Sequence, residues 1–181
     1  MSETEKLKDF LFNTKKCGWE TLADSVKNDV IRFSDEYIHF LNRSKTEREA
    51  TGFITEILDK NGFVNIKDKM ILVPGDKVYY VNREKSVYAA IMGNKPVEAG
   101  LNIIGSHIDS PRLDLKPNPL YEDNRFAYFK THYYGGVKKY QWTTIPLSIH
   151  GVIVKANGEK VTINIGEDES DPIFTITDLL P

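Results

Sequence analysis

A short apolar run followed by polar, potentially reactive side chains places the strongest constraint on the fold of this chain. Leu101–Ile104 is apolar apart from one asparagine, and the next segment, Gly105–Pro111, reads Gly-Ser-His-Ile-Asp-Ser-Pro. Short apolar runs bounded by small residues are typical of strands buried in a parallel sheet. In open α/β sheets, functional side chains gather where the strands end at the carboxyl edge. The sequence therefore predicts an α/β fold with His107 at the end of a buried strand.

His107 and Asp109 are spaced so that they can serve one site. Residues two apart on an extended segment point to the same side, so Ile108 between them is expected to point into packing. Imidazole is the commonest metal ligand among side chains, and a nearby carboxylate fixes its tautomer and raises its basicity. The pair is therefore predicted to be half of a metal centre. Taken alone, the motif favours a plainer interpretation, which is a buried hydrogen-bonded pair in an unrelated α/β protein.

Composition excludes several classes of function. The length of 181 residues suits one domain, or one domain plus part of another, and 40% hydrophobic residues support a packed core. A net charge of -2 gives no electrostatic reason to bind nucleic acid or an anionic membrane. Neither a membrane-spanning run nor an apolar secretion segment is visible. The single cysteine, Cys17, is expected to be a small buried hydrophobe in a reducing compartment, so we expect a cytoplasmic protein.

The first part of the chain is predicted to be helical. Apolar residues recur at helical spacing in Lys6–Lys15 and again after Ser34, which is expected to cap a second helix. Thr46–Glu49 has the form of a capping box, and the helix that it begins is expected to end at Asn61–Gly62. The three charged residues of that box are expected to serve capping and solvation.

The rest of the chain is predicted to be rich in strands. One hairpin is expected to pair Lys77–Val81 with Ser86–Met92, and another to pair Ile145–Lys155 with Lys160–Ile165 across Asn157–Gly158. Further strands are expected at Phe63–Ile66, Met70–Val73, Phe126–His132 and Ile173–Ile176. A shift in composition predicts a domain boundary near Lys139, and His132 and His150 are expected to be packing or edge residues of strands.

Four segments together resemble the M18 family of zinc aminopeptidases, the aspartyl aminopeptidase and aminopeptidase I group. Gly105–Pro111 resembles the first metal-binding motif of that family. The other three are Lys45–Ala50, similar to an early helix, Tyr133–Gly136 with Trp142, similar to the entry into the dimerisation domain, and Asp171–Pro181, similar to a segment within it. The resemblance runs from about Ser34 onward, and bacterial members, especially clostridial ones, are most similar.

The resemblance implies a fold and an activity. Residues 1–139 would form the N-terminal part of a phosphopeptidase-like, mainly parallel α/β catalytic domain, and 140–181 the beginning of a β-rich dimerisation domain. Family members carry two zinc ions, release N-terminal residues from peptide substrates and form homo-oligomers. His107 matches the histidine that binds one zinc ion, and Asp109 matches the aspartate usually counted as catalytic because it orients that imidazole. In the family, metal-bound water attacks the peptide carbonyl and a glutamate acts as general base.

The chain departs from the family in what it lacks. Relatives are much longer, and their bridging aspartate, glutamate base and other ligands come later in the chain. A zinc site needs three or four protein ligands, and the spacing of Asp114, Glu122 and Asp123 does not make them replacements. We therefore expect a truncated aminopeptidase chain that is inactive alone. The alternative is a non-catalytic oligomerisation or binding module derived from the family.

Overall fold

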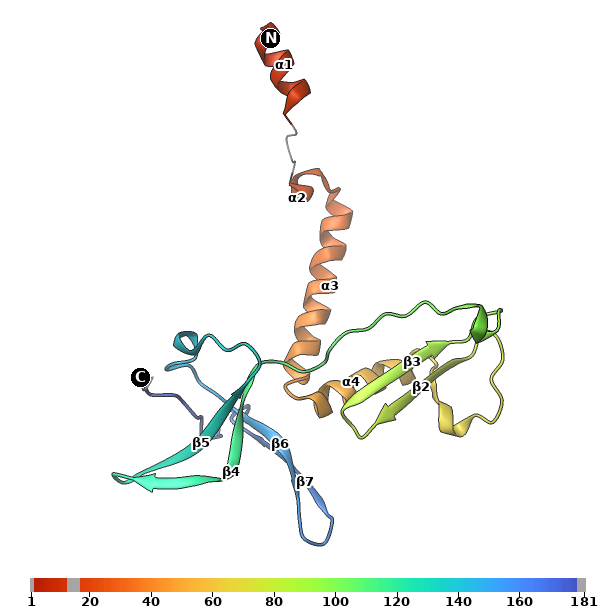
Figure 1. Ribbon diagram of the computed structural model, residues 1–181. Helices are drawn as coiled ribbons and strands as arrows, with labels where there is room; N and C mark the ends of the chain where they lie inside the picture. Colours follow the sequence, from red (N-terminus) through yellow and green to blue (C-terminus); the bar gives the residue numbers. More distant parts are fainter. Residues whose placement is uncertain (1, 13–16, 179–181) are drawn as a thin grey trace. The chain divides into compact units, whose positions relative to one another are not determined.

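The computed structural model describes residues 2–12 and 17–178 (Figure 1). The chain forms two compact units, Met1–Asn42 and Arg43–Pro181. Helices and strands are both present, which confirms the predicted α/β class. Within the described ranges, no helix has the length and apolar character needed to cross a bilayer.

The first unit is helical and contains α1 (Glu3–Leu11), α2 (Gly18–Thr21) and most of α3 (Asp24–Arg43). The predicted helix after Lys6 corresponds to α1, and the end of its predicted range lies outside the described residues. Ser34 was expected to be a cap, but it lies inside α3, where its Oγ donates to the carbonyl of Val30 at 2.9 Å. The apolar stripe begins earlier than predicted, at Val26.

Cys17 is exposed, so the expectation of a buried thiol is wrong. The residue immediately precedes α2, a helix of four residues that buries none of them. Such a short helix offers no apolar face under which a neighbouring thiol could be covered.

In the second unit, α4 (Glu47–Lys60) lies beside a three-stranded sheet of β1 (Val64–Asn65), β2 (Lys77–Asn82) and β3 (Ser86–Ile91). β1 is parallel to β2, and β2 is antiparallel to β3. The predicted capping box is confirmed, because Thr46 N–H donates to Glu49 Oε2 at 2.9 Å and Glu49 N–H donates to Thr46 Oγ1 at 3.3 Å. Ala50 of α4 and Val78 and Tyr79 of β2 are buried and form the described core.

Two hairpins follow, and short 3₁₀ helices lie in the connections between the described elements. β4 (Arg112–Asp123) pairs with β5 (Phe126–Tyr134), and β6 (Ile149–Val154) pairs with β7 (Lys160–Ile165). The 3₁₀ helices are η1 (Ile66–Asp68), η2 (Val97–Ala99) and η3 (Lys139–Gln141). The hairpins predicted across residues 82–85 and Asn157–Gly158 are confirmed. Met70–Val73 is not a strand, and Ile173–Ile176 makes only isolated bridges through Phe174 and Ile176.

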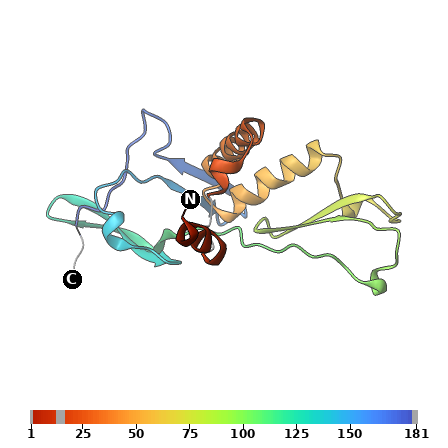
Figure 2. The same cartoon turned by 90° about the horizontal axis from the view of Figure 1, so that it is seen from above.

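The prediction of a buried strand at Leu101–Ile104 is wrong. The segment is irregular, Ile103 is 81% exposed and Ile104 is fully exposed. Figure 2 shows it as part of the long trace between η2 and β4. A run of apolar residues becomes a strand only when a neighbouring strand accepts its backbone hydrogen bonds. Among the described residues no strand pairs with this segment.

Candidate metal-binding and catalytic site

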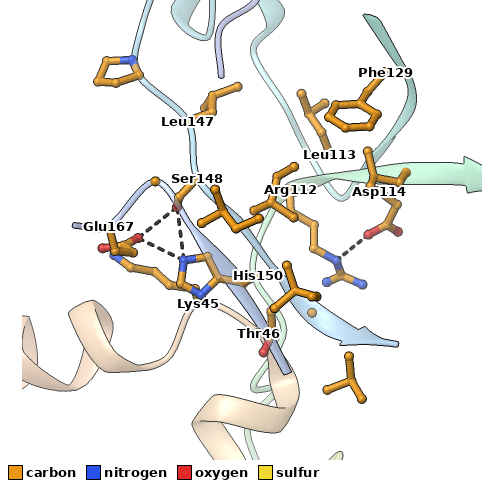
Figure 3. Close-up of a pocket in the computed structure, with 18 of the residues that line it drawn as sticks. Lys45, Thr46, Arg112, Leu113, Asp114, Phe129, Leu147, Ser148, His150 and Glu167 are labelled. Carbon is orange, nitrogen blue, oxygen red and sulfur yellow. Dashed lines mark hydrogen bonds and ion pairs between the residues drawn. The ribbon is translucent and has the colours of Figure 1, made fainter. Parts of the chain in front are cut away.

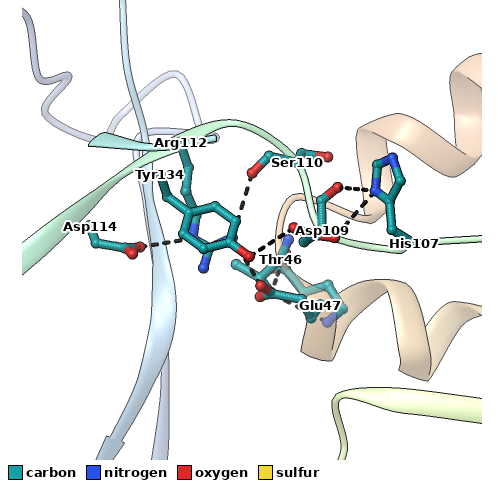
Figure 4. A network of polar contacts seen from close by, with 9 residues as sticks. Thr46, Glu47, His107, Asp109, Ser110, Arg112, Asp114 and Tyr134 are labelled. Carbon is teal, nitrogen blue, oxygen red and sulfur yellow. Dashed lines mark hydrogen bonds and ion pairs between the residues drawn. The ribbon is translucent and has the colours of Figure 1, made fainter. Parts of the chain in front are cut away.

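His107 and Asp109 lie on the irregular segment that leads into β4 (Figure 4). Arg112 at the start of β4 pairs with Tyr134 at the end of β5. This pairing fixes the position of Arg112, where the irregular segment ends. It also brings the Tyr134 hydroxyl within hydrogen-bond distance of Asp109. The hairpin register, rather than a preceding buried strand, therefore positions the candidate site.

The geometry of His107 assigns the tautomer of its imidazole. Its Nδ1 lies 2.9 Å from the backbone carbonyl oxygen of Asp109 and 3.2 Å from the Asp109 Oδ1. Both atoms are acceptors, because a carbonyl oxygen can only accept and the carboxylate is ionised. Nδ1 therefore carries a proton, and a neutral ring then has its lone pair on Nε2. Because the His107 side chain is 83% exposed, it does not fit the alternative interpretation of a buried pair.

Asp109 is held on both of its carboxylate oxygens. Oδ1 faces His107, and Oδ2 accepts a hydrogen bond from the Tyr134 hydroxyl at 2.9 Å. The Tyr134 hydrogen bond, with support from a backbone N–H and from His107, lowers the pKa of Asp109 below its ordinary value. The same contact raises the pKa of the Tyr134 hydroxyl, because its anion would face a carboxylate. Asp109 is therefore a carboxylate that accepts hydrogen bonds from two sides.

Arg112 connects this site to α4. Its guanidinium contacts Glu47 Oε1 at 2.9 Å and Asp114 Oδ1 at 2.8 Å, and it stacks over the Tyr134 ring. Glu47 was expected to serve capping and solvation, and Asp114 was not expected to replace a metal ligand. Both hold Arg112 in place, and Asp114 lies within β4.

A second polar cluster surrounds His150 on β6 (Figure 3). His150 Nδ1 lies 2.7 Å from Glu49 Oε1, and Nε2 lies 2.9 Å from Glu167 Oε1 and 3.1 Å from Ser148 Oγ. A ring with a carboxylate on each nitrogen satisfies both when it is an imidazolium. The hydrogen bond from His150, followed by that from Ser148, lowers the pKa of Glu167. His150 is thus the centre of an ionic cluster and not a simple packing residue. His132 does pack, because its ring stacks on Tyr133.

The His150 cluster lies at the side of an open cleft of about 940 Å³ between the β4–β5 and β6–β7 hairpins. The cleft is lined mainly by apolar residues, among them Leu113, Phe129, Trp142, Leu147 and Ile149. Glu167 Oε1 accepts the Ser148 hydroxyl at 2.9 Å and lies 2.9 Å from His150 Nε2, so the Ser148 proton is directed to Glu167 rather than to the imidazole. The arrangement fits an ionic connection between α4 and the β6–β7 hairpin.

The described residues fit one position of a zinc site. His107 offers Nε2 to the exterior, and Asp109 supplies the carboxylate that commonly stands behind a zinc-bound histidine. Residues 2–12 and 17–178 contain no cluster of three or more His, Cys, Asp or Glu side chains that could hold a metal ion. The other donors of a zinc site are therefore not brought together by this part of the chain.

Comparisons with known proteins agree with the resemblance seen in the sequence. Residues 40–181 match the model of the aminopeptidase I zinc metalloprotease (M18) family. A probable M18 family aminopeptidase 1 of Borrelia garinii is 52% identical over 167 residues, which are 92% of this chain and 36% of that protein. Its counterpart in Clostridium acetobutylicum is 45% identical, over 94% of this chain and 37% of that protein. The chain thus spans little more than a third of the length of these curated relatives.

Solved structures give the same result. The crystal structure of aminopeptidase I from Borrelia burgdorferi B31 matches with a TM-score of 0.86 and 51% identity, over 91% of this chain and 41% of that one. Aminopeptidase I from Clostridium acetobutylicum matches with a TM-score of 0.80 and 46% identity, over 94% and 38%. The chain belongs to the M18 family of zinc metalloaminopeptidases.

Proposed function

We propose that this chain provides the first metal ligand of a zinc-dependent aminopeptidase, with His107 as the ligand and Asp109 as the carboxylate that orients it. The main support for this proposal is that His107 Nδ1 contacts two acceptors. In a neutral imidazole the lone pair is then on Nε2 of this exposed side chain. Family membership and the names of the relatives support the choice of zinc, of peptide substrates and of the release of N-terminal residues.

The roles of the two residues follow from their contacts. The backbone carbonyl and the carboxylate of Asp109 keep the proton on Nδ1, and the negative charge of the carboxylate raises the electron density that Nε2 offers to a cation. His107 would hold one zinc ion, of two in the family pattern, and the chemistry supplied by the bound metal would be polarisation of a peptide carbonyl and a lower pKa of water. The Tyr134 hydroxyl donates to the second oxygen of the Asp109 carboxylate, and the Arg112 guanidinium packs over the Tyr134 ring.

We do not expect this chain alone to hydrolyse peptides. One imidazole is fewer than the three protein ligands of a catalytic zinc site, and the described residues do not assemble the others. We assign residues 1–139 to the catalytic domain and 140–181 to the beginning of a dimerisation domain. A cytoplasmic location is supported by the free, exposed thiol of Cys17, which suits a reducing compartment.

A chimera tests the function directly. The segment of the Borrelia garinii relative that aligns with this chain is replaced by this chain, and hydrolysis of aminoacyl-p-nitroanilides is measured with zinc or cobalt. We expect the chimera to be active, the His107→Ala chimera to be inactive and to bind less zinc, and the His132→Ala control to keep its activity. An active His107→Ala chimera with full zinc content would refute the assignment.

A second candidate function is assembly without catalysis. Ile153, Val154 and Ile173 are more than half exposed in the part assigned to the dimerisation domain. Contiguous patches of exposed apolar side chains are typical of surfaces that a partner covers. Light scattering of this chain should then show a homo-oligomer that Ile153→Asp weakens and Thr162→Asp, a change at a polar exposed position of β7, does not. A strict monomer at high concentration would exclude this candidate.

A further inference from the structure

We propose that Tyr134 is a positioning residue whose hydroxyl fixes the Asp109 carboxylate and, through it, the orientation and tautomer of His107. The proposal rests on the proposed function in one respect, which is that His107 is the metal ligand. Tyr134 Oη donates to Asp109 Oδ2 at 2.9 Å, while the other carboxylate oxygen lies 3.2 Å from His107 Nδ1 (Figure 4). The three side chains form one continuous chain of polar contacts.

Asp109 needs a second partner to hold His107. A carboxylate that contacts an imidazole through one oxygen remains free to rotate about its Cβ–Cγ bond, and about a third of the Asp109 side chain is exposed to competing water. A donor on the other oxygen removes that rotation, and a hydrogen bond to an ionised acceptor is stronger than one between neutral groups. The Tyr134 hydroxyl supplies that donor from a direction that His107 does not use.

Tyr134 is itself fixed by backbone and side-chain contacts. It is the last residue of β5 and pairs with Arg112, the first residue of β4. The Arg112 guanidinium lies 4.1 Å from the centre of the Tyr134 ring and is tied to Glu47 on α4. The next residue, Gly135, has a φ of +74°, and a Cβ there would lie 3.4 Å from the Pro111 Cα. These contacts fix the position of the Tyr134 ring beside Asp109.

Tyr133 provides a matched control. It neighbours Tyr134 in β5, where successive side chains alternate between the two faces of the strand, and its ring contacts His132 and Lys139. Removal of the Tyr133 hydroxyl leaves the Asp109 contact intact. A change that both tyrosine variants cause would reflect a general loosening of the hairpin, whereas a change specific to Tyr134 reflects the hydrogen bond.

The test uses this chain without metal and measures the tautomer of His107 by ¹⁵N NMR of the neutral imidazole. In the wild type we expect the Nδ1–H form to predominate. Tyr134→Phe should lower the ratio of Nδ1–H to Nε2–H several-fold, and Tyr133→Phe should leave it unchanged. In an Asp109→Ala background, Tyr134→Phe should have no further effect, because its influence passes through that carboxylate.

A second readout uses the active chimera. There we expect Tyr134→Phe to lower zinc affinity roughly tenfold, as is typical for outer partners of a ligand. An unchanged tautomer ratio in Tyr134→Phe, or an equal change in Tyr133→Phe, would overturn the positioning role. If zinc fails to bind through His107 in any variant, the proposed function fails, whereas the tautomer measurement still decides the role of Tyr134.

Discussion

Arg112 and Tyr134 face each other across the first pair of the β4–β5 ladder, with the guanidinium 4.1 Å from the centre of the phenol ring. This relationship joins three parts of the chain, because Arg112 also contacts Glu47 on α4 and Asp114 on β4. Tyr134 in turn donates to Asp109, so this set of contacts reaches the carboxylate beside His107. The strength of this connection can be measured as stability.

Arg112→Lys should lower the free energy of unfolding by about 1–2 kcal/mol. Lysine keeps the positive charge but cannot contact Glu47 and Asp114 at once or stack flat on the Tyr134 ring. Urea unfolding followed by circular dichroism measures the change. Arg32→Lys is the control, because the Arg32 side chain is 72% exposed in its ion pair with Asp29 and should change stability by less than about 0.5 kcal/mol. Equal losses in both variants would argue against a connecting role for Arg112.

Thr46→Ala should cost about 1 kcal/mol of stability by removing the cap of α4. The Thr46 Oγ1 accepts the N–H of Glu49, so its loss leaves a helix N–H without that partner. Thr46→Ser retains the hydroxyl and should behave close to the wild type in the same urea titration. A stable Thr46→Ala variant would mean that packing of Ala50 and Thr51 alone fixes the start of the helix.

The parts of the structure that were predictable from sequence are those decided by neighbours in the chain. The capping box of α4, the β2–β3 hairpin and the β6–β7 hairpin depend on residues that are close in sequence. The contact of His107 with Asp109 likewise joins residues only two positions apart. The contact of Tyr134 with Asp109 depends on the β4–β5 register, and the contact of Glu49 with His150 joins positions 101 residues apart. Local sequence patterns do not predict contacts between residues that are so far apart in the chain.

The error at Leu101–Ile104 has a related cause. Its apolar side chains favour an apolar environment, yet Leu101, Ile103 and Ile104 are exposed in this structure. A strand, however, is a property of a pair of segments, and the described residues provide no partner for this one. The relatives, of which this chain spans little more than a third, contain further sequence from which such a partner can come.

Glu167→Gln should make stability less dependent on pH in the acid range. The hydrogen bonds from His150 and Ser148 lower the pKa of Glu167 in the folded state below the ordinary value of 4.5. Between these two pKa values the unfolded chain binds more protons than the folded one. The contribution of ionised Glu167 to the free energy of unfolding is therefore complete above pH 4.5 and is lost as the pH falls through the lower pKa of the folded state. We expect a shallower loss of unfolding free energy on acidification in the variant. Glu169→Gln, an exposed change in the same loop, should keep the slope of the wild type.

Gly166→Ala should destabilise the β6–β7 hairpin and displace Glu167 from His150. Gly166 has a φ of +104°, which side-chain-bearing residues rarely adopt, and a Cβ there would lie 3.0 Å from the Ser148 Cα and 3.1 Å from its Cβ. Because Ser148 immediately precedes β6, its backbone cannot move freely without disturbing the pairing of β6 with β7, and we expect a loss of at least about 1 kcal/mol. Gly151→Ala is the matched control, since its added Cβ meets nothing within 4 Å. Urea unfolding gives the stability, and NMR of the His150 ring reports whether Glu167 still faces Nε2. A Gly166→Ala variant as stable as Gly151→Ala would show that the loop can shift away from Ser148 at no cost.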